Sequence, residues 1–362
     1  MRDIRISIAV IVSILISLGT VMIYSSSGVY ALQELGNSTY FLSRHLFFLV
    51  LGSTLMILTM MIDYRQLKPL AKPLLIVTFI LLVLVLIPHI GKSSFGARRW
   101  FKIGFLSFQP SEFAKLMILI YVANFLSRKQ NKITDFREGF LPPIMVMGAL
   151  CLLILKQPDL GTPVLIANIV MMMLFVAGAR PWHLGSLVLM ALPALYVLVV
   201  KVPYRFNRII AFLDPWQDSQ GVGFQLSQSQ IALGSGGIFG LGLGKSVQKL
   251  FYLPAAHTDF ILSIIGEELG LIGTLSVVIL FVMLIWQGAR IVKRTTDPFG
   301  YFLGLGIVSM IGLQTVVNIG VSIGAFPTKG LPLPFISYGG SALMFNMVAI
   351  GLLLNISRVE DL

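Results

Sequence analysis

Residues 6–24 read ISIAVIVSILISLGTVMIY, an apolar stretch of about 19 residues that no charged residue interrupts. A helix needs about 20 apolar residues to cross the hydrocarbon of a bilayer. The stretch is longer than the apolar region of a signal peptide, and no clear small-x-small cleavage site follows it. We therefore expect it to be a membrane-spanning helix that is retained.

Composition extends this interpretation to the whole chain. Of 362 residues, 56% are hydrophobic and 12% are charged, and the mean hydropathy is +0.90, which excludes a soluble globular protein. Apolar stretches recur as far as residue 356. Inside a bilayer their backbone polar groups must bond to one another, which favours helices. The sequence predicts an all-α polytopic membrane protein with one domain, residues 1–362.

The apolar stretches divide into about ten expected spans, with a long extracytoplasmic loop, 201–258, between the seventh and the eighth. An even number of spans places both termini on one side of the membrane, and the positive-inside rule favours the cytoplasmic side. The expected spans are 6–27, 41–62, 69–90, 111–127, 139–156, 162–179, 183–200, 259–289, 299–323 and 336–356.

Basic residues are not depleted on the expected outer side, although the net charge of +12 is mostly explained by topology and lipid headgroups. They follow no aromatic-basic stripe, which argues against nucleic acid as a partner. Either the long loop is exempt from the rule and its charges are simply solvated, or they bind an anion. The outer set is Lys92, Arg98, Arg99, Lys102, Lys156, Lys201, Arg205, Arg208, Lys245, Lys249 and Lys329.

Several common kinds of site are not indicated. GLGKS at 242–246 lacks the first glycine of a phosphate-binding loop, because Phe239 stands there. The four histidines have no metal-ligand spacing, and the single Cys151 cannot form an intramolecular disulfide. ISYGGSA at 336–342 has no nucleophile elbow, so Ser337 is interpreted as part of a close-packed entrance to the tenth span.

Two loop stretches predict local structure. PSEFAKL at 110–116 indicates a helix start, with Glu112 and Lys115 three residues apart and therefore able to pair on one helix face. LGSGGIFGLGLGKS at 233–246 is too rich in glycine for a helix interior. It predicts an irregular, re-entrant or tightly packed segment.

The remaining acids are few and lie in costly places. Asp259 stands two residues after His257 at the mouth of the eighth span. The histidine either tunes this acid or makes an ordinary interfacial hydrogen bond. Asp159, Glu267 and Glu268 must face protein or water; capping explains much of Asp159, whereas the role of the two glutamates stays open.

Four long motifs, in order, resemble the SEDS family of membrane proteins (shape, elongation, division and sporulation), and more narrowly its FtsW division type. The elongation type, RodA, is the close relative. The resemblance covers nearly the whole chain. The motifs are GARRWFKIGFLSFQPSEFAK (96–115), QPDLGT (157–162), the stretch from GSGG to EELG (234–270) and PTKGLPLPFISYGG (327–340).

The resemblance implies a peptidoglycan glycosyltransferase that polymerises lipid II at the outer face of the bacterial cytoplasmic membrane during cell division. It also implies a class B penicillin-binding protein and other division proteins as partners. Asp259, the acid of the HTDF motif, is then the residue required for polymerisation. Ala255 and Ala342 depart from the family pattern, and neither departure changes Asp259 itself.

Such a polymerase needs one base and a stabilised diphosphate leaving group, so a single outer acid suffices. Asp259 is the expected general base. A divalent cation would help to hold the diphosphate, but no dedicated metal site is visible. Outer-edge residues expected to bind substrate are Arg99, Trp100, Lys102, Lys245, Lys249, His257 and Lys329; expected supporting residues are Glu112, Lys115, Asp159, Glu267, Glu268 and Ser337.

Two alternatives stay open. A lipid II flippase would depend on ionisable residues deep in the membrane, such as Glu267, Glu268 or Lys115. A scaffold without catalytic activity would tolerate the loss of Asp259.

Overall fold

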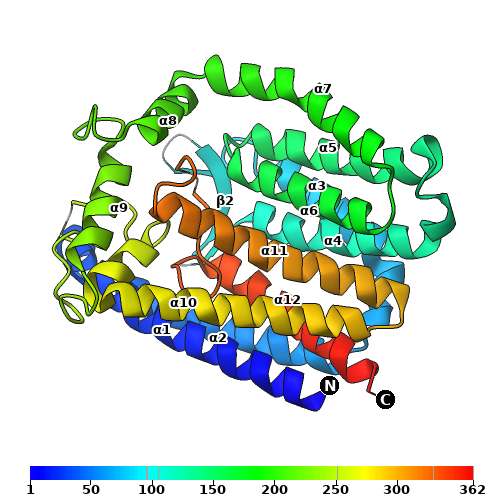
Figure 1. Ribbon diagram of the computed structural model, residues 1–362, viewed down its shortest axis with the longest axis horizontal. Helices are drawn as coiled ribbons and strands as arrows, with labels where there is room; N and C mark the ends of the chain where they lie inside the picture. The colour runs from blue at the N-terminus through cyan, green and yellow to red at the C-terminus, as the bar shows by residue number, and fades with distance from the viewer. Residues whose placement is uncertain (95–96, 105, 251, 329, 362) are drawn as a thin grey trace.

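The computed structural model describes all residues except 95, 96, 105, 251, 329 and 362. Most of the chain is helical, as predicted, and the long helices run side by side in one bundle (Figure 1). The helices are α1 (Arg2–Leu35), α2 (Tyr40–Met61), α3 (Leu67–Leu84), α4 (Pro110–Lys129), α5 (Leu141–Leu155), α6 (Gly161–Val176), α7 (Pro181–Val200), α8 (Pro203–Leu213), α9 (Phe224–Ser235), α10 (Ile261–Arg294), α11 (Pro298–Ser322) and α12 (Gly340–Val359).

Each of the ten expected spans corresponds to one helix. Among the described residues, eight helices are long and apolar enough to cross a membrane. The helix α5 is one of them because a π-helical turn, Phe136–Phe140, runs into it and gives a span of 20 residues. The exceptions are α6, which has only 16 residues, and α4, whose buried Glu112, Lys115 and Asn124 make it more polar. Both lie inside the bundle, where neighbouring helices cover them.

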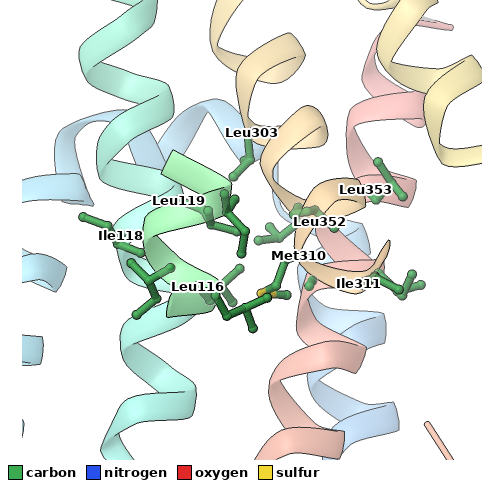
Figure 2. Close-up of a cluster of buried hydrophobic side chains, with 14 of the residues drawn as sticks. Leu116, Ile118, Leu119, Leu303, Met310, Ile311, Leu352 and Leu353 are labelled. Atoms are coloured by element: carbon green, nitrogen blue, oxygen red, sulfur yellow. The ribbon is translucent and has the colours of Figure 1, made fainter. Parts of the chain in front are cut away.

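The centre of the bundle is formed by α4, α11 and α12. Leucine, isoleucine and methionine side chains from the three helices meet there, including Leu119, Met310 and Leu352 (Figure 2). Most of the described apolar side chains of α7, such as Leu189 and Met190, instead face outward, as expected of a helix in contact with lipid. Polar side chains such as Gln314 and Asn318 on α11 are buried inside the bundle.

Both termini lie at the same end, where Arg5 pairs with Asp361 at 2.6 Å. The opposite end, called the distal end, carries the connections that the sequence predicted as irregular. Two of its features were not predicted. The loop 201–258 contains the helices α8 and α9, and a small antiparallel sheet precedes α4. Its strands are β1 (Lys92–Ser94), β2 (Ala97–Ile103) and β3 (Leu106–Phe108), in the order β1-β2-β3.

A break in α10 shapes the distal end. The carbonyls of Glu267 and Glu268 accept from the backbone N–H groups of Leu241 and Gly242, at 2.9 and 3.0 Å, instead of from the next helical turn. Gly270 has a φ of 68°, and a Cβ there would lie 2.4 Å from the Gly240 nitrogen. The glycine-rich segment therefore inserts into the helix, which confirms the predicted tight packing.

Candidate active site

Asp259 lies at the distal end, in a tight turn that leads into α10. The carbonyl of Ala255 accepts hydrogen bonds from the backbone N–H groups of Thr258 and Asp259, at 3.0 and 3.1 Å. Ala255 has a φ of 57°, a left-handed conformation that costs free energy in a residue other than glycine. The turn therefore fixes the backbone of Asp259 just outside the helix.

The side chain of Asp259 is half-buried, and its carboxylate is open. No group within the described residues donates a hydrogen bond to it or forms an ion pair with it. Gly330 lies against it, because a Cβ at that glycine would be 3.3 Å from the Asp259 Oδ2 atom. The backbone carbonyl of Asp259, in contrast, accepts from the side-chain amide of Asn318 at 3.0 Å. The backbone is held while the carboxylate stays available.

Two arginines and one acid set the electrostatics of Asp259. Burial raises the pKa of Asp259 to about 6, while the positive charges of Arg208 and Arg99 oppose the increase and the negative charge of Asp159 adds to it. Such a carboxyl group is mostly ionised at neutral pH, yet it is more basic than an ordinary aspartate. It therefore has the properties of a general base.

Each of these neighbours is anchored by backbone contacts. Arg99, on β2, donates from Nε to the Gln157 carbonyl at 2.8 Å and from a second nitrogen to the Pro158 carbonyl. Arg208, on α8, donates to the Thr328 carbonyl at 3.0 Å. Four connections far apart in the chain thus meet around Asp259, from β2, the start of α6, α8 and the loop before α12.

Asp159 caps the first turn of α6, as expected. Its carboxylate accepts from the Thr162 N–H at 3.2 Å and from the Thr162 hydroxyl at 2.8 Å. The side chain is 8% exposed, so its charge acts on Asp259 through the protein rather than through water.

His257 turns toward an aromatic cluster. Its ring centroid lies 4.6 Å from that of Phe41, with Tyr30 and Tyr338 also in ring contact. Burial lowers the pKa of His257 to about 4, which leaves the ring neutral at neutral pH. Its backbone carbonyl accepts from the Tyr338 N–H at 2.9 Å. The histidine therefore packs the HTDF turn against α2 and the loop before α12.

The predicted pairing of Glu112 with Lys115 is confirmed, with Nζ and Oε2 2.8 Å apart and both side chains buried. Lys115 also donates to Gln314 on α11 at 3.1 Å, and the amide nitrogen of Gln314 donates to the Pro332 carbonyl at 2.7 Å. This chain of contacts connects α4 to the loop before α12, the same loop that carries Gly330.

Glu267 and Glu268 hold the glycine-rich segment against α10 and α1. Glu268 pairs with Lys249 at 2.7 Å and accepts twice from the Ser25 hydroxyl. Glu267 accepts from the Ser246 hydroxyl and from the Val247 N–H, the latter at 2.9 Å. Lys249 is only 7% exposed and its ammonium group faces a carboxylate, so its contacts here are structural.

The other predicted site residues are dispersed. Trp100 is half-buried on β2, Lys245 is exposed, and Ser337 accepts from the Leu333 N–H at 2.9 Å. Lys102 lines an open hollow of about 490 Å³ together with Lys92 and His89. Lys329 lies outside the described residues. Across the described part of the chain, no three potential metal ligands of the His, Cys, Asp or Glu type come together.

Sequence reasoning missed two residues of this site. Arg208 belonged to the basic set of the long loop, but nothing in the sequence distinguished it from its neighbours. Asn318 gave a signal that was not used, namely a buried amide in the apolar stretch TVVNIGVS. A buried polar side chain must be hydrogen-bonded, so it marks a specific contact.

Comparison with known proteins identifies relatives over nearly the full chain. A family model described as "Cell cycle protein", for FtsW, RodA and SpoVE, matches residues 5–362. A probable peptidoglycan glycosyltransferase FtsW of Geobacter metallireducens is 48% identical over 339 residues, which cover 94% of this chain and 90% of the relative. Stage V sporulation protein E of Bacillus subtilis is 45% identical over 351 residues, which cover 97% and 96% of the two chains.

Solved structures agree in fold. A chain from a structure described as "Structural coordination of polymerization and crosslinking by a peptidoglycan synthase complex" superposes with a TM-score of 0.79 at 29% identity, covering 98% of this chain and 97% of that one. The rod shape determining protein RodA of Thermus thermophilus gives a TM-score of 0.71 at 29% identity, covering 97% and 95%.

Proposed function

Because the chain belongs to the SEDS family of cell cycle proteins and is of the FtsW type, we propose that it is a peptidoglycan glycosyltransferase that polymerises lipid II during cell division. One observation carries the proposal at residue level. Asp259 has an open carboxylate on a fixed backbone, with two anchored arginines acting on its charge.

In the proposed reaction, the 4-hydroxyl of one lipid-linked disaccharide attacks the anomeric carbon of another. The new glycosidic bond forms as the bond from that carbon to the diphosphate breaks, with inversion at the carbon. Asp259 accepts the hydroxyl proton, and undecaprenyl diphosphate leaves with the electron pair. Because a diphosphate is a good leaving group, it needs no protonation by a second acid.

The leaving diphosphate requires positive charge, which Arg99 and Arg208 supply in this proposal. A guanidinium group has five N–H donors, and the bonds of Arg99 to two backbone carbonyls leave others to bind phosphate oxygens. Anchoring the side chains beforehand reduces the reorganisation that transition-state stabilisation requires. Two exposed lysines, Lys102 and Lys245, stay candidates for further contacts with the substrate. Lys329 also stays a candidate, and it lies outside the described residues.

A shallow apolar groove of about 40 Å³ lies between α6 and α11, and in this proposal a short part of a polyprenyl chain lies along it. One of its walls is Leu331, the neighbour of Gly330 beside Asp259, so a chain in the groove would begin next to the acid. Its lining residues are Gly161, Val164, Leu165, Asn168, Leu313, Val317 and Leu331.

We place the protein in the bacterial cytoplasmic membrane, with both termini in the cytoplasm and the distal end outside. Support comes from the apolar helices, from the location of both termini at one end, and from the basic residues at the end that carries the termini. A class B penicillin-binding protein is the proposed partner, in keeping with the polymerization and crosslinking named for the similar complex.

The test is to reconstitute the purified protein with a class B penicillin-binding protein and lipid II, then to measure glycan chains. We expect Asp259→Asn to reduce the rate about 10²- to 10⁴-fold, the usual contribution of a general base. The matched control is Asp218→Asn, which changes an exposed acid in the loop 201–258 and should keep the wild-type rate.

Equal yields from wild type and Asp259→Asn would remove this acid from the mechanism. No chains from either protein would favour a flippase or a scaffold. The buried ionisable residues argue against the flippase, because Glu112, Lys115, Glu267 and Glu268 are all bonded to other side chains or backbone groups.

A further inference from the structure

A buried polar stripe runs along α11. Gln314, Asn318 and Ser322 recur at intervals of four residues, so they lie on one face of the helix, and none is more than 2% exposed. Burying an amide without partners costs free energy. The hydrogen bonds of these side chains must therefore offset the cost of burying them.

The bonds of Asn318 join two segments that are far apart in the chain. Its Nδ2 atom donates to the Asp259 carbonyl at 3.0 Å and to the Leu331 carbonyl at 2.9 Å. A primary amide has two N–H groups, so both donors are used. One turn earlier on the helix, Gln314 donates to the next carbonyl of the same loop, that of Pro332.

This double contact sets the surroundings of the Asp259 carboxylate. Leu331 follows Gly330, which lies against the carboxylate, and Thr328 in the same loop accepts from Arg208. Asn318 thus ties the turn that carries the acid to the loop that contacts one of its arginines. A shift between these two segments would change how the acid faces that arginine.

We propose that Asn318 is a positioning residue for the general base, acting through the backbone of Asp259 and the loop residues 330–332. The inference rests on the proposed polymerase function and adds a residue to it. The competing explanation is that Asn318 serves only helix packing. Asn346 provides the reference for that case: it is equally buried on α12, and its Nδ2 atom has no hydrogen-bond partner within the described residues.

The test compares Asn318→Leu, which keeps the approximate size and removes both donors, with the matched Asn346→Leu. Both are measured as full-length protein with the penicillin-binding partner and lipid II, with rates normalised to folded protein by size-exclusion chromatography. A displacement of the acid by about 1 Å costs up to about 100-fold, so Asn318→Leu should lower kcat about 10- to 100-fold. The KM for lipid II should change less than about twofold, because substrate contacts remain. Asn318→Ser, which keeps one donor, should fall between Asn318→Leu and wild type.

A second measurement does not depend on activity. Hydrogen–deuterium exchange of the backbone amides in 255–260 and 330–338 should become faster in Asn318→Leu and not in Asn346→Leu, also in an Asp259→Asn background. Unchanged exchange overturns the inference, and so does faster exchange with a wild-type kcat. If Asp259→Asn retains full activity, the proposed function fails, and the exchange data still decide whether Asn318 holds the two segments together.

Discussion

Two groups of acids at the distal end differ in how their oxygens are used. Glu267 and Glu268 are almost fully buried, and both oxygens of each carboxylate accept hydrogen bonds. Asp259 is half-buried, and within the described part of the chain its carboxylate accepts none. Its backbone is nevertheless held on both sides, by Ala255 and by Asn318.

This difference indicates a structural role for Glu267 and Glu268 and leaves the carboxylate of Asp259 free for the proposed proton transfer. A carboxylate whose two oxygens both accept from buried donors stabilises the segments that carry those donors, and the donors compete with a substrate proton for its lone pairs. An open carboxylate on a fixed backbone contributes little to folding and is ready to accept that proton. Sequence alone left the role of Glu267 and Glu268 undecided, and their contacts favour the structural role.

The largest expected effect is on stability. Glu268→Ala leaves Lys249 buried without its carboxylate, which should lower the free energy of unfolding by about 3–5 kcal/mol. Asp259→Asn breaks no side-chain contact among the described residues and removes a charge that burial disfavours, so it should not lower the free energy of unfolding. Unfolding midpoints in detergent compare the two variants.

The double variant Lys249→Met with Glu268→Leu is the control, because apolar replacement of a whole buried pair is often neutral. It should recover most of the lost stability. If Asp259→Asn destabilised the protein as much as Glu268→Ala, the distinction between the two groups would collapse.

A smaller effect is expected at Gly330. A Cβ at this position would lie 3.3 Å from the Asp259 Oδ2 atom, so Gly330→Ala forces the carboxylate to move by a few tenths of an ångström. We expect kcat for polymerisation to fall by up to about 10-fold with little change in KM. Gly148→Ala on α5, where no atom lies within 4 Å of the new Cβ, is the matched control. Identical rates for the two variants would show that Asp259 is not confined as described.

The smallest effect is a shift in pH dependence. In the proposed mechanism polymerisation requires ionised Asp259, so kcat/KM should fall as the pH drops through about 6. Arg208 lowers the pKa of this acid. Arg208→Gln should therefore move the acidic limb of the pH profile of kcat/KM to higher pH. Arg98→Gln, an exposed change on β2, should leave the limb in place. A limb that stayed fixed in Arg208→Gln would exclude the proposed charge contact.

Much of the fold was predictable from the sequence, because apolar length is a local property. All ten expected spans are helices, although α1 extends to Leu35 and α12 begins only at Gly340. The pairing of Glu112 with Lys115 was predictable for the same reason, since three residues bring side chains to one helix face. The helix α9 and the small sheet were not predicted, because their short segments lack a strong hydropathy period. The helix α8 has an amphipathic pattern, with Phe206, Ile209, Ile210 and Leu213 on one face, and this signal was not used.

The sequence by itself determined that the chain crosses a membrane as helices, and it singled out Asp259 as the acid at a helix mouth. It could do so because the bilayer requires long apolar stretches with internally bonded backbones. Only the tertiary structure decided which charges surround that acid. Lys249 forms an ion pair with Glu268, the charge of Arg208 acts on Asp259, and Asn318 donates to the Asp259 carbonyl. Such contacts between distant segments depend on how the helices pack, and they leave no period in the sequence.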